Sequence, residues 1–452
     1  MYSRLNQFVR VAKTLQNSYT KLVMLDIKFI RENPEIVKQA AKNKRVKIDI
    51  DELIKLDNEA RSVQAELDTT RAEQKQKSKE ARGESDELKA LKEKVKTLEA
   101  RYNEVTTKLD VLLLVVPNIP ADDVPVGKDE TDNVVLREVG EKGKFSFEPK
   151  DYLTLGESLG IIDIKTAAEV SGTRFGYLKG AAALLEFALI QFAMSVLTDE
   201  TKLKHITKEA GLTDVGTRPF VPVVPPAMLR EEVYRKMARL EPKDERYHIP
   251  SDDLWLAGSA EHTLGPMHMD HTFDEKDLPI RYVGFASSFR RESGSYGKDT
   301  KGILRVHQFD KVEMESFCLS ETSRLEQDFT VAIQEHLWQL LKIPYQVINI
   351  CTGDMGAPDA RQIDINAWMP GQGTFRETNT SDLNTDYQAR RLGTKVKRGG
   401  KNEFVHMVDA TVFAMGRTII AILENYQQAD GTIKIPEVLQ QYMDGRTIIG
   451  SK

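Results

Sequence analysis

The chain has 452 residues, 40% of them apolar, and a formal net charge of -5. The apolar content excludes wholesale disorder, and the length predicts about three domains at roughly 150 residues each. Because the net charge is near neutral, a nucleic-acid-binding surface has to be a local patch rather than the whole surface. The two cysteines, Cys318 and Cys351, exclude a disulfide framework and a four-cysteine zinc site.

The sequence contains no run with the composition of a membrane span, which needs ~18 consecutive apolar residues. The longest apolar candidate, residues 181–197, is interrupted by Glu186 and Gln191. We therefore expect a buried helix or a subunit contact there, and no membrane partner.

Residues 1–23 read as an N-terminal extension. They contain no acidic residue and four basic ones, Arg4, Arg10, Lys13 and Lys21. This composition is typical of an organellar presequence, and the alternative is an upstream extension with Met24 as the working start. We expect a cytoplasmic protein, or an organelle-matrix protein if the extension is a presequence.

Two runs of apolar residues repeat at alternating steps of three and four, from Leu53 to Leu67 and from Leu88 to Leu112. A mean spacing of 3.5 residues is the signature of a coiled coil. Between the runs, Gly83 can break a helix and Ser85 can cap the next one. The pattern predicts an antiparallel two-helix hairpin within residues 24–125, with a second helix over 86–116.

The segment 71–82, next to the predicted turn, has a net charge of +3 because it contains five basic and two acidic residues. The basic residues are Arg71, Lys75, Lys77, Lys79 and Arg82. A protruding basic tip suits salt-sensitive binding to phosphate backbones. The alternative is that Lys and Glu side chains simply solvate an exposed coiled coil.

Residues 121–147 are rich in Pro, Gly and acids, which predicts a linker. The remainder, taken as a second domain over 126–452, mixes a helical run at 181–197 with short strand-like runs at 219–226, 282–285 and 345–350. Their spacing predicts an α+β body built on a mostly antiparallel sheet with flanking helices.

A first charged cluster spans residues 289–313 and combines Arg290, Glu292, Arg305, Phe309 and Glu313 around a Gly-rich turn. Arginines hold phosphate oxygens bidentately, and a Phe ring can stack on a purine. The alternative is a solvated β-hairpin with routine salt bridges. The turn is not a P-loop, because the residue after its lysine is neither Ser nor Thr.

Two further clusters follow. In residues 376–391, Glu377 is a candidate Mg²⁺ ligand, because Mg²⁺ prefers one or two carboxylates plus substrate phosphates. In residues 416–425, Arg417 stands at the start of an apolar helical run, from which it can point into a cleft. An ordinary salt bridge and a C-terminal core helix are the alternatives.

Taken together, the three clusters resemble the motifs of class II aminoacyl-tRNA synthetases, and the chain from about residue 24 resembles the seryl-tRNA synthetase family. The matching stretches are 171–175, 224–226, 289–313, 352–356, 376–391 and 414–427. The resemblance implies that the hairpin is a tRNA-binding arm and that residues 126–452 form a class II catalytic domain. It also implies a homodimer joined through residues 181–197 and the strand before Pro226.

The resemblance implies that L-serine and ATP give seryl-adenylate, and that the seryl group then passes to the 3′ end of serine tRNA. Selenocysteine tRNA is a second candidate acceptor. The alternatives are a catalytically weak or non-catalytic tRNA-binding relative and a seryl ligase that acts on another acceptor.

The family motifs also imply residue roles. The chemistry would depend on Arg290, Glu377 and Arg417, with Glu377 holding Mg²⁺ through ATP. The implied ATP-binding residues are Arg290, Arg291, Glu292, Arg305, Val306, Phe309, Glu377, Thr378, Asn379, Thr380 and Arg417. The implied serine-binding residues are Ser259, Ala260, Glu261, Arg290, Glu313, Asp409 and Thr411. The implied tRNA-binding residues are those of the basic tip.

Four positions depart from the commonest family pattern. Ser259 stands where Thr is usual, Thr380 where Ser is usual, and Ser381 where Cys is common. Asp409 stands where many members carry Asn. The last departure adds a carboxylate near the expected substrate pocket, so it bears directly on the contacts to serine.

Overall fold

The computed structural model describes residues 25–80, 85–293 and 301–450. The chain divides into two compact units, Met1–Ile119 and Pro120–Lys452, which we call the arm and the body. The extension 1–23 and Arg82 lie outside the described residues. Each unit is described by itself.

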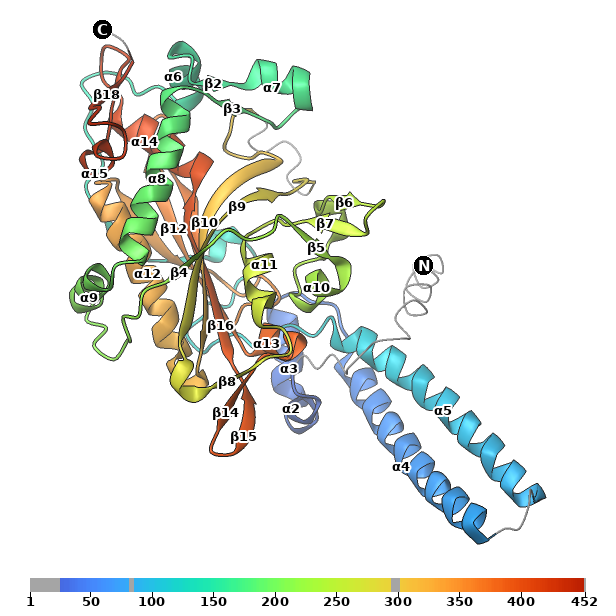
Figure 1. Cartoon of the computed structure of the whole chain (residues 1–452). Coiled ribbons are helices and arrows are strands. Elements are labelled where there is room, and N and C mark those ends of the chain that lie inside the picture. The colour runs from blue at the N-terminus through green and yellow to red at the C-terminus, as the bar shows by residue number, and fades with distance from the viewer. Residues whose placement is uncertain (1–24, 81–84, 294–300, 451–452) are drawn as a thin grey trace. The chain divides into compact units, whose positions relative to one another are not determined.

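The arm consists of helices, as the heptad pattern predicts (Figure 1). Its helices are α2 (Ile27–Glu32), α3 (Pro34–Asn43), α4 (Ile50–Glu80) and α5 (Asp86–Leu113). Ion pairs Arg101–Glu59 and Arg71–Glu99 join α4 to α5 in antiparallel order. Ser85 caps α5 by accepting a hydrogen bond from the backbone N–H of Leu88 at 3.2 Å. The predicted antiparallel hairpin is therefore confirmed.

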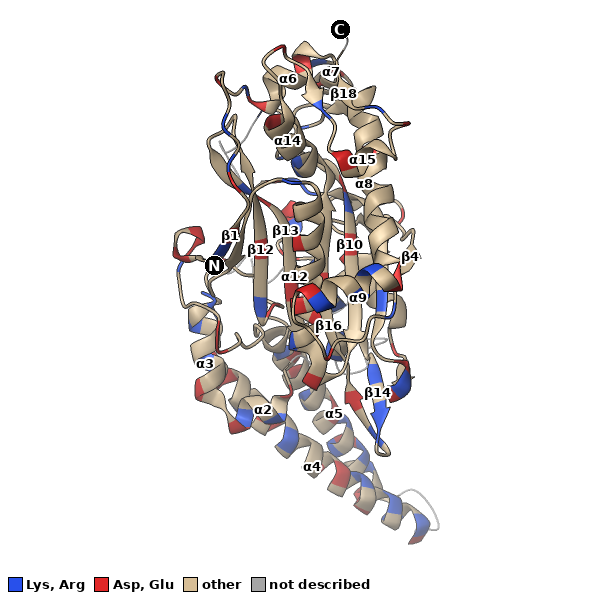
Figure 2. Cartoon of the chain, turned by 90° about the vertical axis from the view of Figure 1, so that its left-hand side faces the viewer, with Lys and Arg blue, Asp and Glu red and all other residues tan. Residues whose placement is uncertain are grey.

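The apolar seam of the hairpin is buried along much of its length. Leu53, Val105 and Leu109 belong to one cluster that also packs against α2 and α3. The second helix ends at Leu113, three residues earlier than predicted. The chain tightens there into a turn, in which the N–H of Val115 donates to the carbonyl of Leu112, before Pro117 stops any continuation. Basic and acidic residues are interspersed along both helices (Figure 2).

The body is built on an eight-stranded sheet with the strand order β1-β11-β12-β13-β16-β10-β9-β4. Neighbouring strands are antiparallel except β4 and β9, which run parallel. The strands are β1 (Val134–Val139), β4 (Val221–Val223), β9 (Ile280–Phe289), β10 (Gln308–Cys318), β11 (Tyr345–Asn349), β12 (Arg361–Met369), β13 (Thr374–Thr385) and β16 (His406–Ala414). The predicted α+β body with a mostly antiparallel sheet is confirmed.

Helices and short strands surround this sheet. The helices are α6 (Tyr152–Ser158), α7 (Ile164–Ser171), α8 (Ala181–Leu197), α9 (Glu200–Glu209), α10 (Glu231–Lys236), α11 (Glu261–Leu264), α12 (Ser323–Leu340), α13 (Tyr387–Leu392), α14 (Met415–Tyr426) and α15 (Glu437–Gln440). The short strands are β2 (Ile162–Asp163), β3 (Tyr177–Leu178), β5 (Met228–Arg230), β6 (His248–Ile249), β7 (Leu254–Leu256), β8 (Thr272–Asp274), β14 (Lys395–Arg398), β15 (Lys401–Phe404), β17 (Ile433–Lys434) and β18 (Ile448–Ile449).

The two faces of the central strands have different chemistry. Val312 and Met314 of β10 join the main apolar cluster on the face that α12 covers (Figure 2). Because side chains alternate along a strand, Glu313 and Glu315 point to the opposite face. Their partners across the strand pair, Thr411 and Asp409, lie on that same face. The sheet therefore separates an apolar core from a polar face.

The segment 121–147 is not a linker, so that prediction was wrong. It contains β1, which pairs with β11 at the edge of the main sheet. Asp123 forms ion pairs with Arg324 and Arg361 of the body. The turn at Gly127 docks closely on the body, because a Cβ added there would lie 2.8 Å from Cys351 Sγ. Composition alone did not distinguish such turns from a flexible connection.

Among the described helices, no single one is long and apolar enough to cross a membrane. The consecutive helices α8 and α9 meet the requirement only as a pair, bent by 80° at the break between them.

Candidate active site

A pocket of about 240 Å³ opens on the polar face of the sheet, between β10, β13, the start of α14 and the segment that precedes β10. Its lining includes Lys311 and Thr411, and every implied ATP-binding residue except Arg291. Arg291 instead donates from Nε to the carbonyl of Arg246 at 2.9 Å, and its guanidinium lies over the ring of Tyr247. The fold thus gathers residues that lie more than 100 positions apart in the chain.

Arg290 is held where β9 ends. Its backbone N–H donates to the carbonyl of His307 at 3.0 Å, which closes the strand pair just before the loop. Its Nε donates to the carbonyl of Gly258 at 3.0 Å, and its guanidinium carbon lies 5.4 Å from the centre of the Phe309 ring. These contacts leave the outer nitrogens of the guanidinium for a ligand and place them beside an aromatic face.

Two ion pairs flank the pocket. Arg305 Nη1 lies 2.8 Å from Glu292 Oε2, and Arg417 Nη1 lies 3.0 Å from Glu377 Oε1. Arg417 stands in the first turn of α14, as predicted, and also donates to the backbone carbonyl of Glu377. Each arginine already has a carboxylate partner, so a phosphate that binds the arginine would replace that carboxylate.

Thr378 and Asn379 line the pocket, but their polar side-chain atoms serve the protein. Asn379 Nδ2 donates to the carbonyls of Thr411 and Val412, and its Oδ1 accepts from Trp338 Nε1 at 2.7 Å. Thr378 Oγ1 donates to the carbonyl of Ile365 at 3.0 Å. These two residues shape the floor of the pocket rather than offering free side-chain donors.

A buried group next to this pocket contains Ser259, Ala260 and Glu313, three of the implied serine-binding positions. Ser259 Oγ donates to Glu313 at 2.6 Å, and the backbone N–H of Ala260 donates to the same carboxylate. Lys311 Nζ also contacts Glu313. Burial opposes ionisation of Glu313, but Lys311 and these donors outweigh it and lower the pKa of its carboxyl. Glu313 is therefore a fixed carboxylate.

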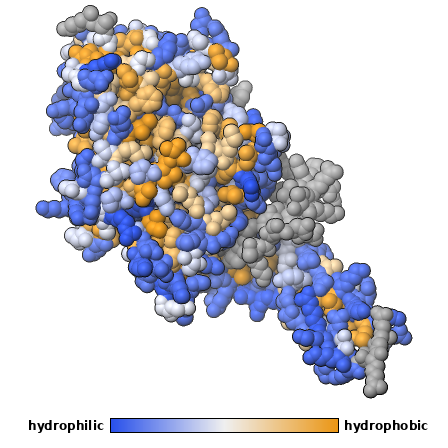
Figure 3. All heavy atoms as spheres, viewed as in Figure 1, coloured by the Kyte–Doolittle hydropathy of each residue, from blue (hydrophilic) through white to orange (hydrophobic). Residues whose placement is uncertain are grey.

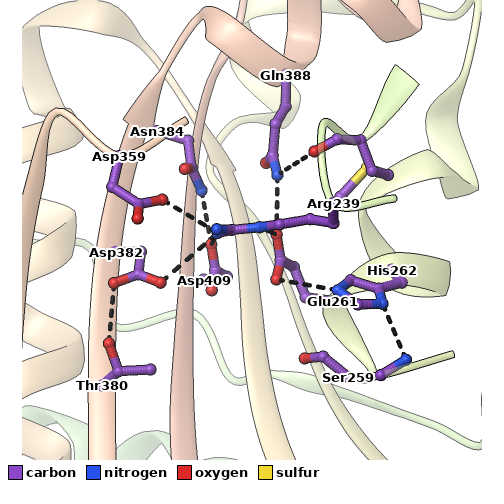
Figure 4. Close-up of polar contacts among 12 residues, drawn as sticks. Arg239, Ser259, Glu261, His262, Asp359, Thr380, Asp382, Asn384, Gln388 and Asp409 are labelled. Carbon is purple, nitrogen blue, oxygen red and sulfur yellow. Dashed lines mark hydrogen bonds and ion pairs between the residues drawn. The ribbon is translucent and has the colours of Figure 1, made fainter. Parts of the chain in front are cut away.

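Glu261 and Asp409 belong to a second buried group, centred on Arg239 (Figure 4). Arg239 Nε lies 2.8 Å from Glu261, and its Nη2 lies within 3.7 Å of Asp359, Asp382 and Asp409. We call these five residues the Arg239 cluster. Burial raises the pKa of the Asp382 and Asp409 carboxyls well above their usual values.

Sequence reasoning missed both Arg239 and Lys311. Arg239 stands in a turn after α10, and its partners Glu261 and Asp359 are 22 and 120 residues away in the chain. A contact over such a separation cannot be predicted from a local sequence pattern. Lys311 follows Phe309 on β10 with the alternation of the strand, so its position beside Glu313 could have been inferred from that period.

Four of the basic residues implied for tRNA binding, Arg71, Lys75, Lys77 and Lys79, lie towards the C-terminal end of α4. Arg71 is paired with Glu99 at 2.7 Å, and Lys77 with Glu87 and Glu73. Lys75 and Lys79 are exposed and have no ion-pair partner among the described residues.

The described residues contain no group of three or more His, Cys, Asp or Glu side chains that could hold a metal ion by themselves. The carboxylate of Glu377 is half exposed at the pocket, and the hydroxyl of Thr380 also lines it. Both are oxygen donors, which suits an Mg²⁺ ion whose other ligands come from substrate phosphates and water.

Comparison with known proteins agrees with this architecture. Residues 24–120 match the seryl-tRNA synthetase N-terminal domain, and residues 246–426 match the tRNA synthetase class II core domain (G, H, P, S and T). The chain is 41% identical over 433 residues to the serine–tRNA ligase of Dictyoglomus turgidum, covering 93% of this chain and 98% of that relative. It is 40% identical over 463 residues to that of Pyrococcus horikoshii, covering 94% and 98%.

Solved structures show the same likeness. The crystal structure of seryl-tRNA synthetase from Pyrococcus horikoshii complexed with ATP matches with a TM-score of 0.83 and 38% identity, covering 95% of this chain and 100% of that one. The cytoplasmic serine–tRNA ligase from Naegleria fowleri in complex with AMP matches with a TM-score of 0.81 and 30% identity, covering 95% and 99%. The chain belongs to the seryl-tRNA synthetase family of class II aminoacyl-tRNA synthetases.

Proposed function

We propose that this protein activates L-serine with ATP to form seryl-adenylate and pyrophosphate, and then transfers the seryl group to the 3′ end of serine tRNA. The observation that carries the proposal is the pocket that brings Arg290, Arg305, Glu377 and Arg417 together around one space. Its position next to the buried carboxylates Glu313 and Glu261 supports it. Relatives whose structures hold ATP or AMP share this fold over nearly the whole chain.

ATP would lie along the pocket. Arg290 bridges the α-phosphate and the serine carboxylate, while Arg305 and Arg417 hold the distal phosphates. Glu292 contacts the adenine, and Phe309 stacks on it. The carboxylate of serine is already a nucleophile, so the first step needs positioning and compensation of growing negative charge rather than a general base. Arg291 stands outside the pocket, so we expect little from its side chain in this step.

Mg²⁺ would enter with ATP and offset the charge of the phosphates when bound. Glu377 would hold it, and the half-exposed position of that carboxylate supports this role. Arg417, released from Glu377, would then be available to the phosphates.

For serine, Glu261 would meet the ammonium group, and Glu313, helped by Thr411, would accept from the hydroxyl. Ser259, Ala260 and Lys311 already hold Glu313 in place, which supports a rigid hydroxyl-recognising site. A site built in this way rejects alanine strongly, because its buried polar groups would be left unpaired.

The acceptor would be serine tRNA, with selenocysteine tRNA as a second candidate, and the arm would hold it. The exposed lysines Lys75 and Lys79 support an electrostatic contact to the tRNA backbone. Residues 24–125 would thus form the tRNA-binding domain and 126–452 the catalytic domain. We place the protein in the cytoplasm, or in an organelle matrix if residues 1–23 direct import.

A homodimer is the assembly we propose for the body. Apolar side chains gather across the middle of the face shown in Figure 3. On α8 and around β4, Phe187, Val221 and Val224 are 57%, 53% and 88% exposed. Large exposed apolar side chains close together mark an interface rather than a solvated surface. A monomeric, active protein in solution would refute the dimer.

The deciding experiment is ATP–pyrophosphate exchange with each amino acid in turn, followed by charging of serine tRNA. Exchange with serine and charging of serine tRNA are expected. If none of the amino acids supports exchange, the proposed enzymatic activity is refuted. If serine supports exchange but serine tRNA is not charged, the acceptor is a different molecule. Deleting about residues 71–98 is expected to leave exchange intact and to weaken charging, whereas equal loss of both would contradict the separate role of the arm.

A further inference from the structure

We propose that Arg239 is a positioning residue for amino-acid recognition, which fixes the carboxylate of Glu261 so that one of its oxygens faces the ammonium group of the substrate. The inference rests on the proposed function, because it takes Glu261 as the partner of the serine ammonium. Arg239 itself does not touch the substrate in this account.

The first support is that two donors converge on a single oxygen of Glu261. Arg239 Nε and Gln388 Nε2 both lie 2.8 Å from Oε1. They come from different elements, the turn after α10 and the helix α13 (Figure 4). Two directional donors on one oxygen fix the rotation of the carboxylate, and they leave Oε2 as the acceptor for a ligand.

The second support concerns the side of Glu261 on which Oε2 lies. His262 Nε2 is 3.9 Å from Oε2, which is too long for a hydrogen bond. The Nδ1 of His262 accepts from the backbone N–H of Gly258 at 3.0 Å, so Nε2 carries the proton of a neutral ring. Burial lowers the pKa of His262 well below its usual value, so the ring stays neutral. The neutral His262 ring therefore does not compete with an incoming cation for Oε2.

The third support is the way Arg239 itself is held. Its Nη2 faces Asp359 at 3.1 Å, Asp382 at 3.6 Å and Asp409 at 3.7 Å. Thr380 donates to Asp382 at 2.9 Å, and Asn384 donates to Asp409 at 2.6 Å. Carboxylates from three segments thus lock one end of the guanidinium, and its other end is aimed at Glu261. Asp409, which stands where many family members carry Asn, is part of this lock.

The distinguishing measurement is the split between KM and kcat in serine-dependent ATP–pyrophosphate exchange. We expect Arg239→Gln to raise the KM for serine about 10- to 100-fold, the range for losing a hydrogen bond to a charged group. The KM for ATP should stay within about twofold of wild type, because the two ion pairs that flank the nucleotide pocket do not involve Arg239.

Arg239→Gln leaves buried carboxylates without their cation and can therefore fail to fold. A second variant keeps the test decisive in that case. Arg239→Gln with Asp409→Asn removes the cation together with one of the acidic groups that face it, so it should regain thermal stability but not the low KM for serine. Arg281→Gln is the matched control: Arg281 is also buried and paired with a buried carboxylate, that of Glu326, and none of its partners belongs to the Arg239 cluster. It should lower thermal stability without raising the KM for serine.

A folded double variant with the wild-type KM for serine would overturn the role of Arg239 and leave the proposed function standing. A rise in that KM in Arg281→Gln equal to that in the double variant would also overturn it, because loss of any buried arginine would then have the same effect. Absence of serine-dependent exchange in the wild type would overturn the proposed function and this inference with it.

Discussion

The nucleotide pocket and the Arg239 cluster both pair arginines with carboxylates, but they do so in different surroundings. In the pocket, the side chains of Arg417 and Glu377 are 25% and 54% exposed. In the Arg239 cluster, those of Arg239 and Asp409 are 16% and 7% exposed. Water screens the first kind of pair, whereas removing one partner of the second kind destabilises the fold strongly, because the other partner is left buried without compensation.

This difference suits the two ligands. A triphosphate brings its own negative charge, so the arginines that bind it can exchange one anionic partner for another at little cost. An amino acid brings a single ammonium group, and the groups that select it need to be in place beforehand. The pocket charges should therefore govern catalysis with little effect on folding, and the cluster charges should govern both.

The largest expected effect is on catalysis at the pocket. Arg417→Ala should lower the rate of ATP–pyrophosphate exchange about 10²- to 10³-fold, the range for removing one group that stabilises developing charge. Its melting temperature should match that of wild type, because the ion pair that it removes is partly exposed. Arg398→Ala is the control, since Arg398 is similarly exposed and paired with Glu275 and Glu321 outside the pocket. If Arg417→Ala lowered the melting temperature strongly and Arg398→Ala did not, the claim that the pocket charges have little effect on folding would be wrong.

The lysines of the arm add a third case to this comparison, because Lys75 and Lys79 are exposed to water. Replacing Lys75 and Lys79 by Gln should weaken serine-tRNA binding several-fold at low salt. The slope of log binding constant against log salt concentration should become less negative by about 1.5. Each phosphate that a lysine no longer neutralises accounts for roughly 0.7–0.9 of that change. Binding titrations at several salt concentrations measure this, with exchange activity unchanged. The same substitutions at Lys47, just before α4, and at Lys55, near its N-terminal end, serve as the control, since both lysines are exposed. An equal effect of both pairs would mean that the tip has no special role.

Asp409 tests the cost of burying a carboxylate in the cluster. Burial raises the pKa of Asp409 well above its usual value, so its protonated form is favoured in the folded state. The stability that this group contributes is therefore lost as pH rises from the ordinary aspartate pKa through the folded value. Asp409→Asn should melt a few degrees higher than wild type at pH 9 and gain less at pH 5. A gain that does not change with pH would show that Asp409 is not neutral in the fold.

The smallest expected effect concerns Glu186 on α8, which lies beside Asp310 outside both regions. Burial, with a hydrogen bond to Asp310, raises the pKa of Glu186 to about 8. Its contribution to stability is present near pH 4 and lost as pH rises towards 8. Glu186→Gln should match wild type in melting temperature at pH 5 and exceed it slightly at pH 9. Thermal melts of both proteins at the two pH values test this, and a larger gain at pH 5 would reverse the assignment.

The sequence was most informative where the relevant contacts are local or periodic. The 3.5-residue period predicted the hairpin of α4 and α5, and Ser85 caps α5 as expected. The strand-like run at 282–285 lies within β9, as the spacing predicted. What could not be predicted depends on contacts far apart in the chain: Arg239 meets Asp359 across 120 residues, and only the assembled sheet brings them together. The segment 121–147 misled for the same reason, since turns that dock on a distant strand have the composition of a flexible connection.

That docked segment has a consequence for the edge of the main sheet. β1 is short, has an irregular register between Val135 and Arg137, and carries Arg137, whose side chain pairs with Glu335 of α12. An edge strand of this kind occupies the hydrogen-bonding groups of β11 and discourages the addition of a strand from another molecule. A shortened body that began after residue 139 would expose β11 and invite self-association into aggregates, even though every residue of the nucleotide pocket would still be present.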